Sequence, residues 1–133
     1  MCGVLGMVSS SSRDEHGVEE QCAAATAALR HRGPDDHGQY REGNVWLAHR
    51  RLSILDLTAA GRQPMQSRSG RFVIVYNGEV YNFRELARSH GLDGLRSGSD
   101  TEVILRLFES HQGHSYLRLG MAVRAVKFPE SLV

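Results

Sequence analysis

Cysteine, lysine and long apolar runs are all scarce in this chain of 133 residues. Two cysteines, Cys2 and Cys22, are too few for a disulfide framework, so we expect reduced thiols in a cytoplasmic protein. No stretch approaches the ~18 consecutive apolar residues that a membrane-spanning helix needs. The apolar segment near the start lacks the basic residues that open a signal peptide. The sequence therefore argues against membrane insertion and against secretion.

Net charge is equally slight. Sixteen basic residues stand against fifteen acidic ones, and the basic residues are scattered arginines with a single lysine, Lys127. Because no surface of one sign is indicated, the sequence gives no support for binding nucleic acid or a membrane. Its length and its 41% hydrophobic content fit one globular domain with a sizeable core.

Apolar patterning predicts an α+β fold, with strands in the middle of the chain and helices beside them. We expect strands at 3–9, 37–41, 45–50 and 72–76, and helices at 17–30, 83–89 and from 100 onward. The nearly continuous apolar run in the strand at 45–50 predicts burial on both faces. In the first helix, Cys22 shares a face with other apolar residues, so we expect it to pack in the core.

Turn and cap signals refine this assignment. Asn77-Gly78 predicts a two-residue hairpin turn after the last long strand, with 79–81 extended again. Ser99 and Glu102 form a capping-box pattern, which predicts the start of the final helix. The segment 61–70 is predicted to be a polar loop.

The start of the chain has the most informative chemistry. Removal of Met1, which the small second residue favours, would leave Cys2 with both a thiol and a free α-amine. Both groups titrate near neutral pH, and an amine that accepts the thiol's proton activates the sulfur as a nucleophile. Taken alone, a cysteine at the start of a strand is more often a buried packing residue.

Six segments resemble the glutaminase domain of class II glutamine amidotransferases, and within that family the branch of glutamine-hydrolysing asparagine synthetases. They are MCGV at 1–4, RHRGPD at 30–35, LAHRRLSI at 47–54, QPM at 63–65, YNGEVYN at 76–82 and SDTEV at 99–103. They occur in the family's order and at similar spacing. The run at 52–65 favours this branch over sugar-phosphate and phosphoribosyl amidotransferases.

The resemblance implies a fold and a reaction. The fold is a four-layer αββα amino-terminal-nucleophile hydrolase sandwich, expected to be incomplete at its C-terminus. Cys2 would attack the side-chain amide carbon of glutamine, forming a thioester and releasing ammonia. Asn77 and Gly78 would stabilise the tetrahedral oxyanion, a role in which one donor is typically worth about 10²–10³ in rate.

The resemblance also implies how glutamine is bound. Arg51 would bind the α-carboxylate, Glu79 and Asp100 the α-ammonium, and backbone groups around Ile54 would complete the site. A guanidinium suits a carboxylate because it can bond it in bidentate fashion. Arg50 is expected to point the other way, since successive strand residues face opposite sides. Without the resemblance, Asp100 would equally suit a helix cap.

Other polar residues receive structural interpretations. We expect the polar side chains at 31–35 to brace the Gly33-Pro34 turn, and His49 to be packed or hydrogen-bonded within its strand. His111 and His114 resemble a metal-binding pair, but no further ligands lie nearby in the sequence, so no metal is assigned.

The resemblance fades after Gln112. We expect a glutamine amidotransferase type 2 domain (N-terminal part) at 1–112 and a diverged or truncated tail at 113–133. Residues 122–127 would put a charge on each face of a strand, which breaks the pattern of a core strand. The synthetase domain of the family, with its ATP-binding loop, has no counterpart here, so ATP and magnesium are not expected as cofactors of this chain.

Three hypotheses follow from these observations. The chain is a glutaminase that supplies ammonia to a synthetase-domain partner, a glutaminase module that serves another amide-forming ligase, or a non-catalytic truncated remnant. The expected small-molecule ligand is glutamine. A homodimer is a further candidate assembly, because missing strands would leave edges and an apolar face uncovered.

Overall fold

The computed structural model describes residues 2–9, 15–53, 58–111 and 125–127. Its strands are β1 (Gly3–Val8), β2 (Asp36–Glu42), β3 (Val45–Arg51), β4 (Met65–Gln66), β5 (Phe72–Ile74) and β6 (Ala125–Lys127). Its helices are α1 (Glu15–Ala28), α2 (Phe83–Ser89) and α3 (Asp100–Ser110), with short 3₁₀ turns at Leu29–His31 and Ala59–Gly61. The predicted α+β class is confirmed.

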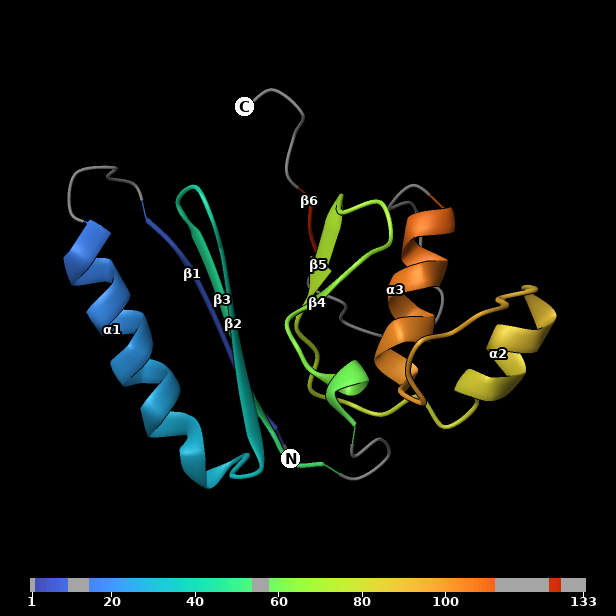
Figure 1. Cartoon of the computed structure of the whole chain (residues 1–133), viewed down its shortest axis with the longest axis horizontal. Coiled ribbons are helices and arrows are strands. Elements are labelled where there is room, and N and C mark those ends of the chain that lie inside the picture. Colours follow the sequence, from blue (N-terminus) through green and yellow to red (C-terminus); the bar gives the residue numbers. More distant parts are fainter. Residues whose placement is uncertain (1, 10–14, 54–57, 112–124, 128–133) are drawn as a thin grey trace.

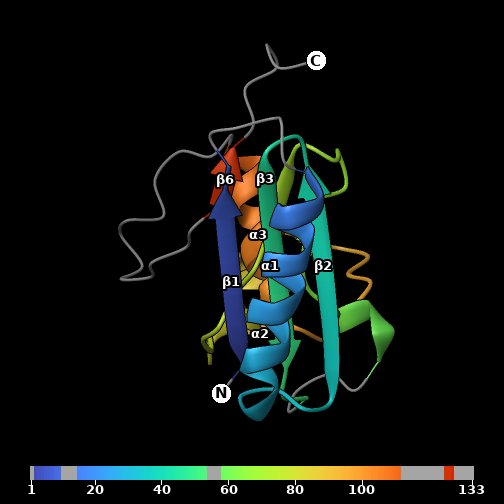
Figure 2. The same cartoon turned by 90° about the vertical axis from the view of Figure 1, so that its left-hand side faces the viewer.

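The first sheet is antiparallel, with strand order β1-β3-β2. Gly3 lies opposite Arg50, and Asp36 lies opposite Arg51, so the start of β1 and the start of β2 both meet the end of β3. Helix α1 covers one face of this sheet (Figure 2). β3 is buried along most of its length, as its apolar sequence predicts, and Cys22 of α1 is buried in the core.

The second sheet is also antiparallel, with strand order β4-β5-β6. Val45 and Leu47 of β3 pack against Val73 of β5, so the two sheets contact each other face to face. On the far side of β5, Phe72 packs edge-on against Phe108 of α3, with ring centroids 5.2 Å apart. From left to right, Figure 1 shows α1, the first sheet, the second sheet, and then α3 and α2.

Two sequence predictions around β5 are wrong. The strand ends at Ile74 rather than at residue 76, and Asn77-Gly78 does not connect two paired strands. The reason is that the backbone N–H and C=O of Tyr76 bond to side chains, Gln63 and His49, instead of to a neighbouring strand. The chain therefore leaves the sheet, and Val80 packs into the core beside Phe72 and Ile74.

Two further differences concern short strands. The segment predicted as a polar loop contains β4, whose Met65 lies opposite Ile74. Residues 125–127, whose charge pattern argued against a core strand, form β6 and pair with β5. A backbone ladder can form whatever side chains a strand has, because its hydrogen bonds come from the main chain.

The capping box at α3 is only half formed. Ser99 is the N-cap, and its hydroxyl accepts from the N–H of Thr101. Glu102 does not return to Ser99; its carboxylate accepts instead from the N–H groups of Arg96 and Ser97. Burial alone would raise the pKa of Glu102, but these hydrogen bonds outweigh it and the pKa is lowered.

Several predictions fall outside the described residues, namely the backbone around Ile54, His114, and the tail at 113–124 and 128–133. Among the helices that the structure does describe, none has the length and apolar character required to span a bilayer.

Candidate functional site

A pocket of about 290 Å³ opens beside the end of β3 and the loop that follows β5. Six of the seven residues predicted for the site line it: Cys2, Arg51, Asn77, Gly78, Glu79 and Asp100. Its remaining lining residues are His49, Leu52, Gly61, Gln63, Tyr76, Ser99 and Thr101. The volume lies just below the range for small-molecule sites, about 300–1,000 Å³.

Cys2 owes its position to the first sheet. It immediately precedes β1, and the antiparallel register with β3 brings it beside the residues that follow Arg50. The N–H of Leu52 points at its sulfur at 3.4 Å, and the thiol donates to the carbonyl oxygen of Leu52 at 3.8 Å.

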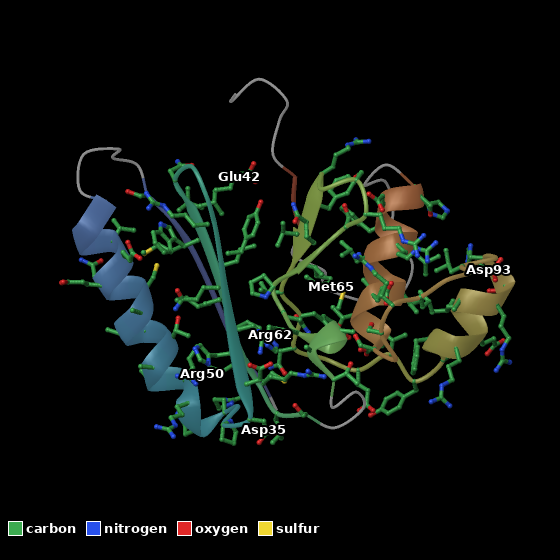
Figure 3. The ribbon with its side chains drawn as sticks, viewed as in Figure 1. Asp35, Glu42, Arg50, Arg62, Met65 and Asp93 are labelled. Carbon is green, nitrogen blue, oxygen red and sulfur yellow. The ribbon has the colours of Figure 1, made fainter. Side chains whose placement is uncertain are left out.

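Strand alternation separates the two arginines of β3, as predicted. The Nε of Arg50 donates to the carbonyl oxygen of Thr26 in α1 at 3.1 Å, and Figure 3 shows Arg50 between α1 and the sheet. Arg51 lies on the opposite face and lines the pocket. It is only 8% exposed, and its Nη1 donates to the carbonyl oxygen of Thr58 at 2.9 Å.

Two carboxylates also line the pocket. Glu79 is exposed, whereas Asp100 is 5% exposed, and one Asp100 oxygen accepts from the N–H of Val80 at 2.8 Å. The helix-cap interpretation of Asp100 is wrong, because Ser99 caps α3. One oxygen of the Asp100 carboxylate therefore bonds outside its own helix, next to the pocket.

Within the segment 76–78, the backbone of Gly78 lies very close to the ring of Tyr76. A Cβ atom at Gly78 would lie 2.5 Å from the Tyr76 hydroxyl oxygen and 2.6 Å from its Cζ, so only glycine fits there without a shift. Burial raises the pKa of the Tyr76 phenol, and the negative charges of Asp100 and Glu79 raise it further. The phenol is therefore neutral near pH 7.

His49 and Gln63 are buried beside this segment. Nε2 of His49 donates to the carbonyl oxygen of Tyr76 at 3.3 Å, and Oε1 of Gln63 accepts from the N–H of Tyr76 at 2.6 Å. His49 is thus hydrogen-bonded within the fold, as predicted. Its burial lowers the pKa of the imidazole, and the nearby charge of Arg51 acts in the same direction.

The polar segment at 31–35 lies outside the pocket lining. Asp35 accepts from the N–H of Ser53 at 2.7 Å, and Nδ1 of His31 donates to the carbonyl oxygen of Ala28. The Asp35 bond ties the end of the Gly33-Pro34 turn to the segment after β3, whereas the His31 bond stays within the helical turn before it. The neighbouring Asp36 pairs with Arg62 at 2.9 Å, and this hydrogen bond lowers the pKa of Asp36. The pair ties β2 to the segment that leads into β4, where Figure 3 labels Arg62.

Candidate metal ligands do not gather in the described ranges, where no three His, Cys, Asp or Glu side chains are placed to hold an ion. Nδ1 of His111, the C-cap residue of α3, donates to the carbonyl oxygen of Leu107 in that helix at 2.9 Å.

The sequence predictions assigned no role to three residues with polar side chains in this pocket, Gln63, Tyr76 and Thr101. All three fall within the six matching segments, but their residue types gave no chemical signal. A glutamine in a polar loop, an aromatic residue in a strand and a threonine in the first turn of a helix are each ordinary in those positions. Only their shared contact in the folded chain distinguishes them.

Comparison with known proteins identifies the family of the chain. The model of the glutamine amidotransferase domain matches residues 1–123. An asparagine synthetase [glutamine-hydrolyzing] of Sandersonia aurantiaca is 39% identical over 121 residues, which are 90% of this chain and 22% of that protein. Asparagine synthetase [glutamine-hydrolyzing] 1 of Arabidopsis thaliana is 39% identical over 84% of this chain and 19% of its own length.

A third relative has a comparable identity to this chain. The putative asparagine synthetase [glutamine-hydrolyzing] 2 of Methanocaldococcus jannaschii is 35% identical over 81% of this chain and 24% of its own length. The chain thus spans about a fifth of the length of the curated relatives that it matches. The chain belongs to the glutamine amidotransferase domain family.

Proposed function

We propose that this chain hydrolyses glutamine to glutamate and ammonia, with Cys2 as the nucleophile. The observation that carries the proposal is the composition of one small pocket. It brings together a thiol, a buried guanidinium and two carboxylates, from segments as far apart in the sequence as residues 2 and 100. A thiol suits attack on an amide carbon, and the charged groups match the two ends of an amino acid.

The reaction divides into two steps. With Met1 removed, the α-amine of Cys2 takes the thiol proton, and sulfur attacks the side-chain amide carbon of glutamine. Asn77 and the N–H of Gly78 donate to the oxyanion of the tetrahedral intermediate. The carbon–nitrogen bond then breaks, the amine returns the proton to the leaving nitrogen, and ammonia departs. Water hydrolyses the thioester, which yields glutamate and restores the thiol.

Substrate binding uses the charged side chains that line the pocket. Arg51 bonds the α-carboxylate, supported by its burial and by the bond from Nη1 to Thr58, which limits the freedom of the side chain. Glu79 and Asp100 accept from the α-ammonium, and backbone groups around Ile54 complete the site. A zwitterion fits a site with charges of both signs because each end meets its complement.

Architecture and partners are part of the same proposal. The order of helix and sheet layers in Figure 1 supports a four-layer αββα amino-terminal-nucleophile fold for the glutaminase module. We further propose that residues 1–112 make up this module, followed by a diverged tail that includes β6. Ammonia would pass to an ATP-dependent synthetase partner, and the two free thiols support a cytoplasmic location.

The proposal is tested by measuring glutamate released from glutamine by the purified chain and by two cysteine variants. Cys2→Ala should abolish release, whereas Cys22→Ala, which changes a buried cysteine of α1, should retain it. Release that survives in folded Cys2→Ala would refute the mechanism. Folded wild-type protein that releases no glutamate would instead support a non-catalytic role.

A further inference from the structure

Both polar groups of the Tyr76 backbone are held by side chains distant in sequence. The N–H donates to Oε1 of Gln63, 13 residues away, and the carbonyl oxygen accepts from Nε2 of His49, 27 residues away. These two bonds fix the orientation of Tyr76 one residue before Asn77. The direction in which Asn77 and Gly78 leave the sheet follows from this orientation.

A chain of hydrogen bonds connects the two ends of the segment 76–80. Nε2 of Gln63 donates to Oγ1 of Thr101 at 3.2 Å, and this hydroxyl donates to Oδ1 of Asp100 at 3.4 Å. The other oxygen of Asp100 accepts from the N–H of Val80. The segment is thus bonded to buried side chains at Tyr76 and at Val80, while the residues between them are exposed.

The protonation state of His49 is settled by its partner. A carbonyl oxygen can only accept, so Nε2 must carry the proton and Nδ1 must carry the lone pair. The side chain is 1% exposed, and Nδ1 has no hydrogen-bond partner in the described part of the chain. A second proton on Nδ1 would leave a buried donor unsatisfied, so the neutral imidazole is the form that fits.

Gly38 of β2 leaves room for the backbone of Gln63. A Cβ atom at this position would lie 2.2 Å from the carbonyl oxygen of Gln63, so the glycine lets Gln63 approach the strand directly. The backbone of Gln63 therefore rests against the first sheet while its side chain reaches Tyr76. We call the two side-chain hydrogen bonds that hold the Tyr76 backbone, from His49 and to Gln63, the Tyr76 clamp. The first sheet supports this clamp through His49 of β3 and through the contact between β2 and Gln63.

We propose that His49 and Gln63 are positioning residues that aim the oxyanion donors Asn77 and Gly78 at the reacting carbonyl. The inference rests on the proposed glutaminase function and assigns a task to two residues outside the predicted site. Neither side chain needs to touch the substrate. They act through the Tyr76 peptide groups, and a displacement of about 1 Å in catalytic geometry can cost about 10² in rate.

Paired variants at His49 separate the hydrogen bond from the bulk of the ring. Glutamine places its amide nitrogen near the position of Nε2 and can donate to Tyr76, whereas asparagine reaches only as far as Nδ1. We expect His49→Asn to lower kcat by about tenfold or more with KM within about threefold, and His49→Gln to recover most of kcat. His37→Asn changes an exposed histidine of β2 outside the pocket and should leave both constants unchanged.

The kinetic result can contradict the proposal in two ways. A folded His49→Asn variant with kcat within about threefold of wild type would show that the bond to Tyr76 does not position the donors. Equal losses in His49→Asn and His49→Gln would assign the effect to the ring itself. Gln63→Met removes the other side-chain hydrogen bond to Tyr76 and provides the kinetic test if His49→Asn does not fold. Exposed Gln66→Met is its control.

Hydrogen exchange gives a readout that does not depend on activity. Gln63→Met should lower the protection of the Tyr76 amide by about tenfold or more, while an amide in the middle of α3, such as Leu105, keeps its protection. Unchanged protection of the Tyr76 amide would show that Gln63 does not hold it and would contradict the proposed clamp. Wild-type protein without glutaminase activity would refute the proposed function alone, because the exchange measurement would still decide whether Gln63 holds Tyr76.

Discussion

Substituting Gly78 with alanine should disable the site through a specific steric conflict. The added Cβ would lie 2.5 Å from the Tyr76 hydroxyl oxygen, where ordinary van der Waals contact begins at 3.4 Å. The ring or the Gly78 peptide must therefore move by about 0.9 Å. Because Gly78 is the proposed backbone donor to the oxyanion, a shift of this size should lower kcat/KM by about 10², equivalent to about 2.7 kcal/mol.

A double-mutant cycle tests whether this conflict is the cause. In a Tyr76→Ala background the ring atoms are gone, but the backbone groups that bond Gln63 and His49 remain. Gly78→Ala should then cost no more than about threefold, so the two substitutions should couple by about 2 kcal/mol. The assay is kcat/KM for glutamine hydrolysis, at a temperature where circular dichroism shows all four proteins folded.

Two results would refute this reasoning. An unchanged kcat/KM in Gly78→Ala would show that the close approach to Tyr76 does not matter for activity. An equal loss in both backgrounds would mean that the added methyl group acts on something other than the Tyr76 ring, such as the bound substrate itself.

Three further predictions concern binding and stability. Arg51→Ala should raise KM for glutamine by about tenfold or more with a smaller change in kcat, measured by steady-state kinetics, and a change in kcat alone would contradict its binding role. Glu102→Gln should lower the free energy of unfolding by about 1–3 kcal/mol near pH 7, because the Arg96 and Ser97 amides lose a charged acceptor. Since the pKa of Glu102 is lowered in the folded state, its contribution to the free energy of unfolding is present above about pH 4.3 and is lost as pH falls through the folded pKa. The difference in free energy of unfolding between wild type and Glu102→Gln, measured by urea titration, should therefore be smaller near pH 3. Exposed Glu85→Gln is the control, and a difference that does not change with pH would refute the assignment. Phe72→Ala should cost about 3–5 kcal/mol in urea unfolding because the ring is 0% exposed, whereas Tyr81→Ala, at 86% exposure, should stay within about 0.5 kcal/mol, and similar losses would contradict the assigned core.

Local patterning was sufficient to predict most of the fold. The helix at 83–89 and the strands near 3–9 and 45–50 follow from apolar periodicity and turn residues, which act over a few neighbours. The alternation of side chains along β3 also correctly separated Arg50 from Arg51. These features depend on backbone geometry that any similar sequence would share.

The segment after β5 could not be predicted in this way. Asn77-Gly78 has the strongest local signal for a hairpin, yet Tyr76 bonds to residues 13 and 27 positions away. Those bonds form only after the two sheets pack, so tertiary contacts override the local preference. The same holds for Glu102, whose carboxylate turns away from the capping box toward the loop at 96–97.

The site residues are a different case, because their types and positions came from the family resemblance. The structure brings six of them to one pocket, but the supporting residues Gln63, Tyr76 and Thr101 carry no individual signal in the sequence. A buried polar side chain is recognised by its partners in space, and these partners lie on β3, on α3 and in the segments before β4 and after β5. The sequence alone therefore identifies the groups proposed for the reaction and misses those that hold them in place.

Intact-protein mass spectrometry after a brief reaction with glutamine and an acid quench tests the central claim most directly. The account predicts a chain that has lost Met1 and that carries one glutamyl group, located on Cys2 by peptide mapping and absent from Cys2→Ala. Glutamate released by protein that never carries this group, or a glutamyl group located on Cys22, would contradict the thioester mechanism.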